Sequence, residues 1–225
     1  MRSDSEKLVM RLQPNNRLLF IGDSITDCGR KRPVGEGASE GALGHGYVSL
    51  VDAALAARYP GHDIHIINMG VAGNTVRDLN ARWRTDVLDL NPDWLVVMIG
   101  INDVWQHFSG PWQMGGRISA EEYARTLGNL IERVPTQLNG LILMTPYLLE
   151  PDRRDPMRVL MDQYGAIVHE LAAKHGALLV DTQATFDQVL QRLDPMRLTQ
   201  DRVHLNRAGH TILARAFLER IGDVE

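Results

Sequence analysis

The sequence contains a single cysteine, Cys28, among its 225 residues. One cysteine excludes a disulfide within the chain and is typical of proteins from reducing compartments. Residues 1–7 are mostly polar or charged and lack the apolar core of a secretory signal. We therefore expect a cytoplasmic protein.

The chain also lacks long apolar runs and a strong excess of charge. No apolar stretch approaches the length of a membrane span, so no membrane partner is expected. The net charge of −4 gives no general attraction to nucleic acid. The one compact basic run, residues 30–32, lies in a glycine-rich segment and is typical of a solvated loop.

Aromatic residues make up only 6% of the chain, but hydrophobic residues as a whole make up 44%. That share supports a full globular core, and 225 residues fit one domain. No repeat, linker or low-complexity tract divides the sequence. We expect a single domain over residues 1–225, with its core at about residues 17–222.

Short apolar runs alternate with segments of helical periodicity. The runs predict strands at residues 18–21, 64–67, 94–99, 141–144 and 177–180. Helices are expected at residues 47–59, 75–90, 120–134, 156–175, 183–193 and 207–221. Strands joined by helical crossovers form a parallel sheet covered on both faces. The sequence therefore predicts an α/β fold with three layers (α/β/α), a five-stranded parallel sheet and a flavodoxin-like arrangement.

The first expected strand leads directly into Gly22, Asp23 and Ser24. Sheets of this kind bind ligands at the carboxyl ends of their strands, which is where Ser24 would lie. Thr26 stands where the Gly-x-Ser-x-Gly motif of the α/β-hydrolases has its second glycine. Ser24 alone is also compatible with a helix N-cap, so its partners have to decide its role.

Four further residues are expected at the same edge of the sheet. Gly73 and Asn102 follow the second and third strands, and Asp201 and His204 precede the last helix. A histidine can take the proton of a serine, and a carboxylate can hold that histidine in the right tautomer. A glycine N–H and a side-chain amide can stabilise an oxyanion. The set therefore predicts acyl transfer at Ser24.

Other interpretations use the same residues differently. Gly73 could be a turn residue, and Asn102 could form an Asx turn. His210 competes with His204 as the base, although it falls within the last expected helix. Cys28 is an alternative nucleophile.

A different class, the metal-dependent phosphatases, would use carboxylates as metal ligands. The candidates would be Asp23, Asp103 and Asp181. That interpretation leaves Ser24 and His204 without roles. A binding domain without catalytic activity is a third possibility.

Four blocks of the sequence together resemble the SGNH or GDSL hydrolases: Gly22-Asp23-Ser24, Gly73, Gly100-Ile101-Asn102-Asp103 and Asp201-Arg202-Val203-His204. The resemblance implies a serine esterase or lipase without a metal or cofactor. It implies a catalytic triad of Ser24, Asp201 and His204. The oxyanion hole would comprise Ser24, Gly73 and Asn102, with Gly70 as a rival to Gly73.

Longer strings, at residues 22–30, 98–105, 155–165 and 180–183, resemble the acetylxylan-esterase branch of this family. The implied substrate is a small acetylated sugar such as an acetylated xylo-oligosaccharide. A lysophospholipase or thioesterase with the same site is the alternative. Trp105 and Tyr147 follow strands and could stack on sugar rings or pack beneath loops. Asp23 is a further candidate for substrate binding, and the sequence leaves a homo-oligomer open.

Overall fold

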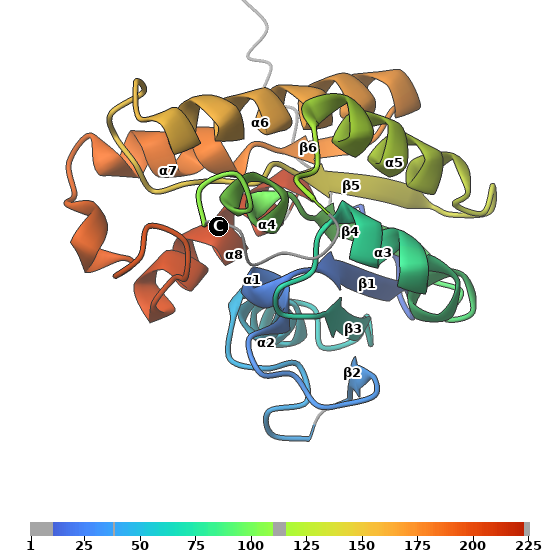
Figure 1. Cartoon of the computed structure of the whole chain (residues 1–225). Coiled ribbons are helices and arrows are strands. Elements are labelled where there is room, and N and C mark those ends of the chain that lie inside the picture. Colours follow the sequence, from blue (N-terminus) through green and yellow to red (C-terminus); the bar gives the residue numbers. More distant parts are fainter. Residues whose placement is uncertain (1–10, 38, 110–115, 223–225) are drawn as a thin grey trace, which may run out of the picture.

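A six-stranded sheet runs through the middle of the protein (Figure 1). The computed structural model describes residues 11–37, 39–109 and 116–222. The strands are β1 (Arg17–Gly22), β2 (Gly35–Glu36), β3 (His65–Gly70), β4 (Trp94–Met98), β5 (Gly140–Met144) and β6 (Leu178–Val180). Their order is β2-β3-β1-β4-β5-β6.

Five of these strands pair in parallel, as the sequence predicts. The short strand β2 is an addition, because it pairs antiparallel to β3 and lies in a segment expected to be a loop. Gly35 of β2 packs so closely that a Cβ atom would come within 2.9 Å of the carbonyl oxygen of Asn68. Two residues of backbone pairing leave no hydrophobic pattern that a sequence analysis can detect.

Helices cover both faces of the sheet (Figure 1). On one face α2 (Tyr47–Arg58) packs against α8 (Arg207–Arg220). On the other, α5 (Ala120–Glu132) packs between α3 (Val76–Trp83) and α6 (Pro156–His175). The helix α7 (Thr182–Leu190), which follows β6, contacts α8. The predicted three-layer α/β/α fold is thus confirmed.

The ends of the helices follow local chemistry that is visible in the sequence. Asp155 accepts hydrogen bonds from two N–H groups of the first turn of α6, and Pro156 occupies that turn. Gly176 ends the helix with a left-handed φ of 63°. Thr75 and Asp78 form a reciprocal capping box at the start of α3. These caps set where each helix begins or ends relative to the strand beside it.

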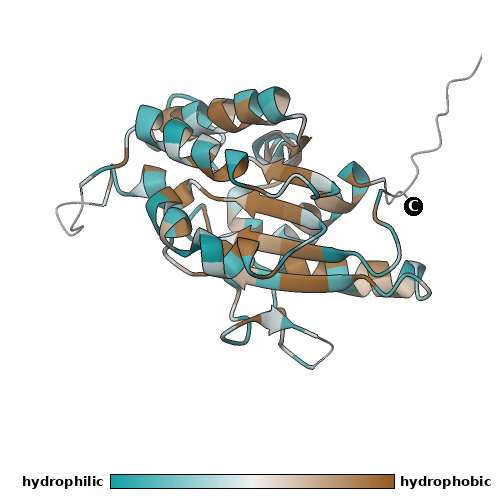
Figure 2. Cartoon of the chain, turned by 90° about the vertical axis from the view of Figure 1, so that its right-hand side faces the viewer, coloured by the Kyte–Doolittle hydropathy of each residue, from teal (hydrophilic) through white to brown (hydrophobic). Residues whose placement is uncertain are grey.

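The core lies between the layers. Strands β1 and β4 consist almost entirely of buried residues, including Leu18, Phe20 and Val96, each with no exposed surface. In Figure 2 the strands are mostly hydrophobic, whereas the helices around them show many hydrophilic residues. Burial on both faces is what a parallel sheet requires, and it holds the strand ends in a fixed arrangement.

Two features differ from the predicted helices. The helix expected at residues 75–90 is α-helical only to Trp83 and continues as one π-helical turn, Arg84–Leu88. A five-residue helix, α4 (Ile101–Trp105), begins directly after β4 and carries Asn102. Among the described helices, none has the length and apolar character to cross a membrane.

Candidate active site

Ser24 lies at the carboxyl end of β1, at the start of the four-residue helix α1 (Ser24–Asp27). The residue before it, Asp23, is the N-cap, and its carboxylate accepts a hydrogen bond of 3.0 Å from the N–H of Ile25. Strands β3 and β4 flank β1 and end at the same edge. The sheet therefore brings the segments that follow these three strands close to Ser24.

Ser24, His204 and Asp201 form a continuous series of hydrogen bonds. The Oγ of Ser24 lies 3.0 Å from Nε2 of His204, and Nδ1 of His204 lies 2.6 Å from Oδ2 of Asp201. With Nδ1 protonated toward the carboxylate, Nε2 is free to accept the proton of the serine. The structure thus brings together the three residues that the sequence predicts as a triad.

The second oxygen of Asp201 holds the turn that carries His204. Its Oδ1 accepts the N–H groups of Val203 and His204 at 3.0 and 2.8 Å and the hydroxyl of Thr199 at 3.0 Å. Partial burial acts in the opposite direction, but the hydrogen bonds from His204, Val203 and Thr199 lower the pKa of Asp201 to about 2. Asp201 is therefore an anion at neutral pH.

Arg202 anchors this turn from the outside and was missed by the sequence analysis. Its backbone has a left-handed φ of 69°, and its side chain pairs with Glu150 at 2.9 Å and Asp155 at 3.1 Å. Its carbonyl oxygen accepts the N–H of Leu149. These partners lie about fifty residues away along the chain, so spacing alone does not indicate them.

Of the two interpretations of Tyr147, the structure supports packing beneath a loop and not stacking on a sugar. The side chain is completely buried, and its ring packs 4.7 Å from that of Phe186. Its hydroxyl donates a hydrogen bond of 3.0 Å to the carbonyl oxygen of Val203, next to His204. A position just after a strand suggested exposure, but the chain stays in the core there, and Tyr147 supports the histidine turn from beneath.

Asp23 is likewise not a substrate contact. Only 1% of its surface is exposed, and its side chain caps α1. Burial raises its pKa to about 7, although the N–H of Ile25 and the charge of His204 act in the opposite direction. The role of Asp23 is to hold the turn that carries Ser24.

Of the two candidate oxyanion glycines, Gly73 is the one exposed at the edge. Its φ of +81° favours glycine, and a Cβ atom would meet nothing within 4 Å. Gly70 is buried, and its N–H donates to Oδ1 of Asn68 at 2.9 Å. A Cβ atom on Gly70 would also clash with the backbone of Asp27. The role of Gly70 is therefore to allow close packing of the backbone at the end of β3. The oxyanion role of Gly73 stays a prediction.

Asn102 points toward the loop that contains Gly73. Its Nδ2 donates a hydrogen bond of 2.9 Å to the carbonyl oxygen of Asn74. The neighbouring Asp103 is completely buried and accepts the N–H of Val76 at 3.0 Å. Helix α4 is thus fastened to the start of α3, which fixes the amide of Asn102 beside the loop.

Trp105, at the end of α4, is partly buried against the core, and its contact with a sugar stays a prediction.

A pocket of about 320 Å³ adjoins Ser24. Its lining includes Ala72, Leu205 and His204 as well as Cys28 and His210. The Sγ of Cys28 lies 3.3 Å from Nε2 of His210. Burial raises the pKa of Cys28 to about 12, with a smaller effect of the charge on Asp27, and burial lowers the pKa of His210 to about 4. The thiol of Cys28 is therefore protonated at pH 7, which disfavours it as a nucleophile, and the low pKa of His210 makes it a weak base.

The three carboxylates of the phosphatase interpretation serve separate structural roles. Asp23 caps α1, and Asp103 holds the start of α3. Asp181 caps α7 by accepting the N–H of Ala184 and pairs with His169 at 2.9 Å. Within the described part of the chain, no three His, Cys, Asp or Glu residues are grouped so that they could hold a metal ion.

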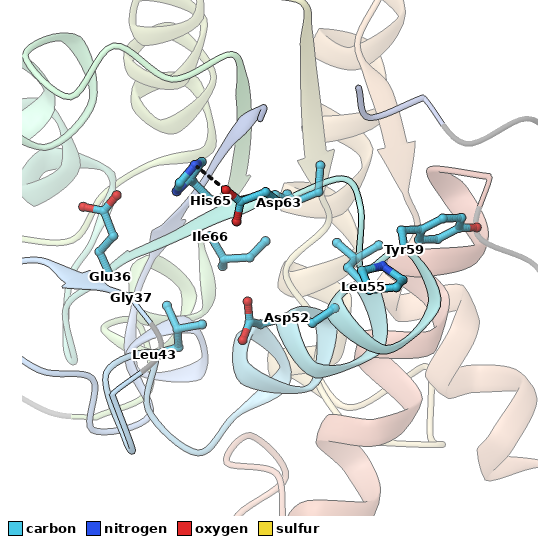
Figure 3. Close-up of a pocket in the computed structure, with 12 residues that line it drawn as sticks. Glu36, Gly37, Leu43, Asp52, Leu55, Tyr59, Asp63, His65 and Ile66 are labelled. Carbon is cyan, nitrogen blue, oxygen red and sulfur yellow. Dashed lines mark ion pairs between the residues drawn. The ribbon is translucent and has the colours of Figure 1, made fainter. Parts of the chain in front are cut away.

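A second pocket, of about 360 Å³, lies between β2, β3 and α2 (Figure 3). Glu36, Asp52 and His65 line it, and His65 pairs with Asp63 at 3.7 Å. Burial raises the pKa of Asp52. The lining contains none of the predicted catalytic residues, so the pocket is separate from the site at Ser24.

The family profile described as GDSL-like Lipase/Acylhydrolase matches residues 20–212. The chain belongs to this family. The family recognised from the sequence is thereby confirmed. An acetylxylan esterase from Geobacillus stearothermophilus is 52% identical over 213 residues, which cover 95% of this chain and 97% of that relative.

Solved structures of two similar proteins have the same fold. The crystal structure of the Geobacillus enzyme, Axe2, gives a TM-score of 0.92 at 52% identity and covers 95% of this chain and 97% of its own. The structure of an alpha/beta hydrolase enzyme from the metagenome of Lake Arreo has a TM-score of 0.93 and is 46% identical in sequence. The match covers 96% of this chain and 100% of that one. In Axe2, alanine variants of a serine, a histidine and an aspartate are described as catalytic mutants.

Proposed function

We propose that this protein is a serine esterase that removes acetyl groups from xylo-oligosaccharides or similar small carbohydrates. The observation that carries the proposal is the series of contacts Ser24–His204–Asp201 at the sheet edge. The substrate class is supported by Axe2, which is described as an acetyl-xylooligosaccharide esterase and matches 95% of this chain.

Acylation would start with proton transfer from Ser24 to Nε2 of His204. As the proton leaves, Oγ attacks the carbonyl carbon of the acetyl ester, and the carbonyl oxygen becomes an oxyanion. The N–H groups of Ser24 and Gly73 and the Nδ2 of Asn102 would donate to that oxyanion. His204 then returns the proton to the sugar oxygen, the ester bond breaks, and the acetyl group stays on Ser24.

Deacylation repeats the same chemistry with water. His204 takes a proton from the water molecule, whose oxygen attacks the acetyl carbon. Collapse of the second tetrahedral intermediate breaks the bond to Oγ of Ser24 and releases acetate, and His204 returns the proton to Oγ. Asp201 stays ionised throughout and stabilises the imidazolium of His204 at each step.

The surroundings of Ser24 favour a short acyl group. The adjoining pocket is small and partly polar, with Cys28, His45 and His210 among its lining. A lysophospholipase needs an extended apolar surface for its acyl chain. In the described residues, the exposed large hydrophobic side chains are only Phe108, Val159 and Met196, which lie in separate segments. A continuous apolar platform is therefore lacking there.

Hydrolysis of p-nitrophenyl esters of increasing chain length tests this proposal. We expect kcat/KM to fall steeply from the acetate to the octanoate, and acetylated xylo-oligosaccharides to be deacetylated. In an enzyme built for long chains, each buried methylene would instead contribute up to about 0.8 kcal/mol. A rising kcat/KM with chain length would overturn the proposal and favour the lysophospholipase or thioesterase alternative.

Trp105 provides a second arm of the same experiment. If its ring contacts the sugar, Trp105→Ala should reduce hydrolysis of acetylated xylobiose more than that of p-nitrophenyl acetate. An equal reduction for both substrates would assign Trp105 to packing alone.

A cytoplasmic location and a homo-oligomer are two further proposals. Cell fractionation would test the location, and light scattering would test the oligomeric state.

A further inference from the structure

We propose that Arg82 is a positioning residue that sets the oxyanion hole in place relative to the nucleophile. Arg82 lies on α3, away from the Ser24–His204–Asp201 series, yet its guanidinium contacts the segments that carry Ser24 and Gly73. The second of these segments in turn accepts the amide of Asn102. This inference rests on the proposed function, because it concerns how the same site reaches its working geometry.

The guanidinium of Arg82 donates four hydrogen bonds. NH2 donates to the carbonyl oxygen of Gly22 at 2.9 Å, and NH1 donates to that of Met69 at 2.7 Å. Nε donates to Oδ1 of Asn74 at 2.6 Å. NH1 also contacts Oδ2 of Asp86 at 2.8 Å, one turn further along the chain. One rigid, planar group thus joins the end of β1, the end of β3 and the loop after β3.

Each predicted oxyanion donor lies next to one of these contacts. Gly22 is two residues before Ser24, and Asn74 directly follows Gly73. The carbonyl oxygen of Asn74 accepts the amide of Asn102 at 2.9 Å. A shift of the Asn74 segment would therefore move the Gly73 N–H and release the Asn102 amide at the same time.

The burial of Arg82 makes these contacts strong. Only 15% of its side chain is exposed. Desolvation lowers its pKa, and Asp86 acts in the opposite direction, so the group remains a cation. Hydrogen bonds from a charged donor are roughly twice as strong as neutral ones. Loss of the guanidinium would also leave the buried carbonyl oxygens of Gly22 and Met69 without this donor.

A positioning role and a purely structural role predict different kinetics. Misplacing a donor weakens contacts that exist only in the transition state, so kcat falls while KM changes little. A structural role would lower stability and leave the kinetics of the folded fraction unchanged. The tests are therefore made well below the midpoint of thermal unfolding, with the concentration of folded protein measured for each variant.

Arg82→Gln, Arg82→Lys and Asn74→Ala form the test series. We expect Arg82→Gln to lower kcat about 10²-fold, because misplacement of about 1 Å can cost that much. The kcat of Arg82→Lys should lie between those of the wild type and Arg82→Gln, since an ammonium keeps the charge but lacks the planar fork. Asn74→Ala removes one acceptor and keeps the arginine, so it should lower kcat about 10-fold at a small cost in stability. KM for p-nitrophenyl acetate should stay within about 3-fold in all three.

Arg158→Gln is the matched control. Arg158 is also buried. It donates hydrogen bonds to the backbone carbonyl oxygen of Glu150 and to the carboxylates of Asp162 and Asp187. None of these partners adjoins a predicted oxyanion donor. Glu150 also pairs with Arg202 on the turn that carries His204, so we expect this variant to lose stability and to lower kcat by less than about 10-fold, well below the loss in Arg82→Gln.

Binding of an aryl trifluoromethyl ketone provides an independent readout. The ketone forms a charged adduct with the serine, so its affinity should fall by the same factor as kcat/KM in the Arg82 and Asn74 variants. A wild-type kcat in folded Arg82→Gln, or equal losses in Arg82→Gln and Arg158→Gln, would overturn the positioning role. If Arg82→Gln does not fold, a wild-type kcat in Asn74→Ala has the same consequence. Failure of the proposed function is distinguishable, because the wild type itself would then not hydrolyse acetyl esters.

Discussion

Asp201 holds His204 at two points, with one oxygen 2.6 Å from Nδ1 of the ring and the other 2.8 Å from the backbone N–H. The first contact fixes the tautomer of the imidazole ring, and the second holds the backbone turn that carries His204. These two effects can be separated by mutation, because an amide can keep one contact and not the other.

Asp201→Asn should therefore impair turnover much more than folding. The amide oxygen can still accept the backbone N–H groups, but the neutral side chain no longer stabilises the imidazolium. By analogy with serine proteases, the loss of kcat approaches about 10⁴-fold. Thermal unfolding and p-nitrophenyl acetate hydrolysis measure the two effects. Wild-type turnover in this variant would show that Asp201 is not part of the triad.

The pH dependence of kcat/KM should reflect the base and not its carboxylate partner. The pKa of Asp201 is lowered to about 2, so Asp201 stays ionised throughout the range from pH 4 to pH 8. We therefore expect no ionisation of Asp201 in the kcat/KM profile between pH 4 and pH 8, because its carboxylate is already charged there. The stabilising contribution of ionised Asp201 should be lost only as the pH falls from about 4 through about 2. A second ionisation above pH 4 that disappears in Asp201→Asn would contradict this account.

Asp103 should make stability fall as the pH rises. Burial raises its pKa to about 7, although the N–H of Val76 acts in the opposite direction. The folded protein therefore keeps this proton up to about pH 7, whereas the unfolded chain loses it near pH 4. Asp103→Asn keeps an acceptor for Val76 and removes the titration. Its stability relative to the wild type should be higher at pH 8 than at pH 5, and denaturant unfolding at the two pH values measures the difference. The opposite order would refute the buried-acid assignment.

Asn102→Ala should affect the transition state selectively. Loss of one oxyanion donor lowers kcat by about 10²–10³, or roughly 3–4 kcal/mol of transition-state stabilisation. KM should change little, because the amide bonds the charged intermediate better than the neutral carbonyl. Steady-state kinetics with p-nitrophenyl acetate separates the two parameters. A raised KM with normal kcat would make Asn102 an ordinary substrate contact.

The strands and the reactive residues were predictable because their signals are local. Four apolar residues before Ser24 indicate a buried strand, and strand ends converge by topology. Asp201 and His204 are three residues apart, so their pairing follows from the chain itself. The N-cap and proline at the start of α6 are local signals of the same kind.

The residues that hold the site in place were not predictable from spacing. Tyr147 bonds the carbonyl oxygen of Val203, which is 56 residues away in the sequence, and Arg82 bonds that of Gly22, which is 60 residues away. Contacts of this range depend on how the layers pack, which no short motif encodes. The same reason explains why Tyr147 and Asp23 were taken for substrate contacts: their positions next to strand ends are visible in the sequence, but their burial is not.

The account depends most directly on Ser24 as the nucleophile. Labelling with a fluorophosphonate, followed by mass spectrometry of the peptides, tests this role. We expect the label on Ser24 in the wild type, and both labelling and almost all turnover lost in a folded Ser24→Ala variant, in which about 10³–10⁴-fold catalysis over water would remain. Undiminished hydrolysis of p-nitrophenyl acetate by Ser24→Ala, or a label on another residue such as Cys28, would contradict the serine mechanism.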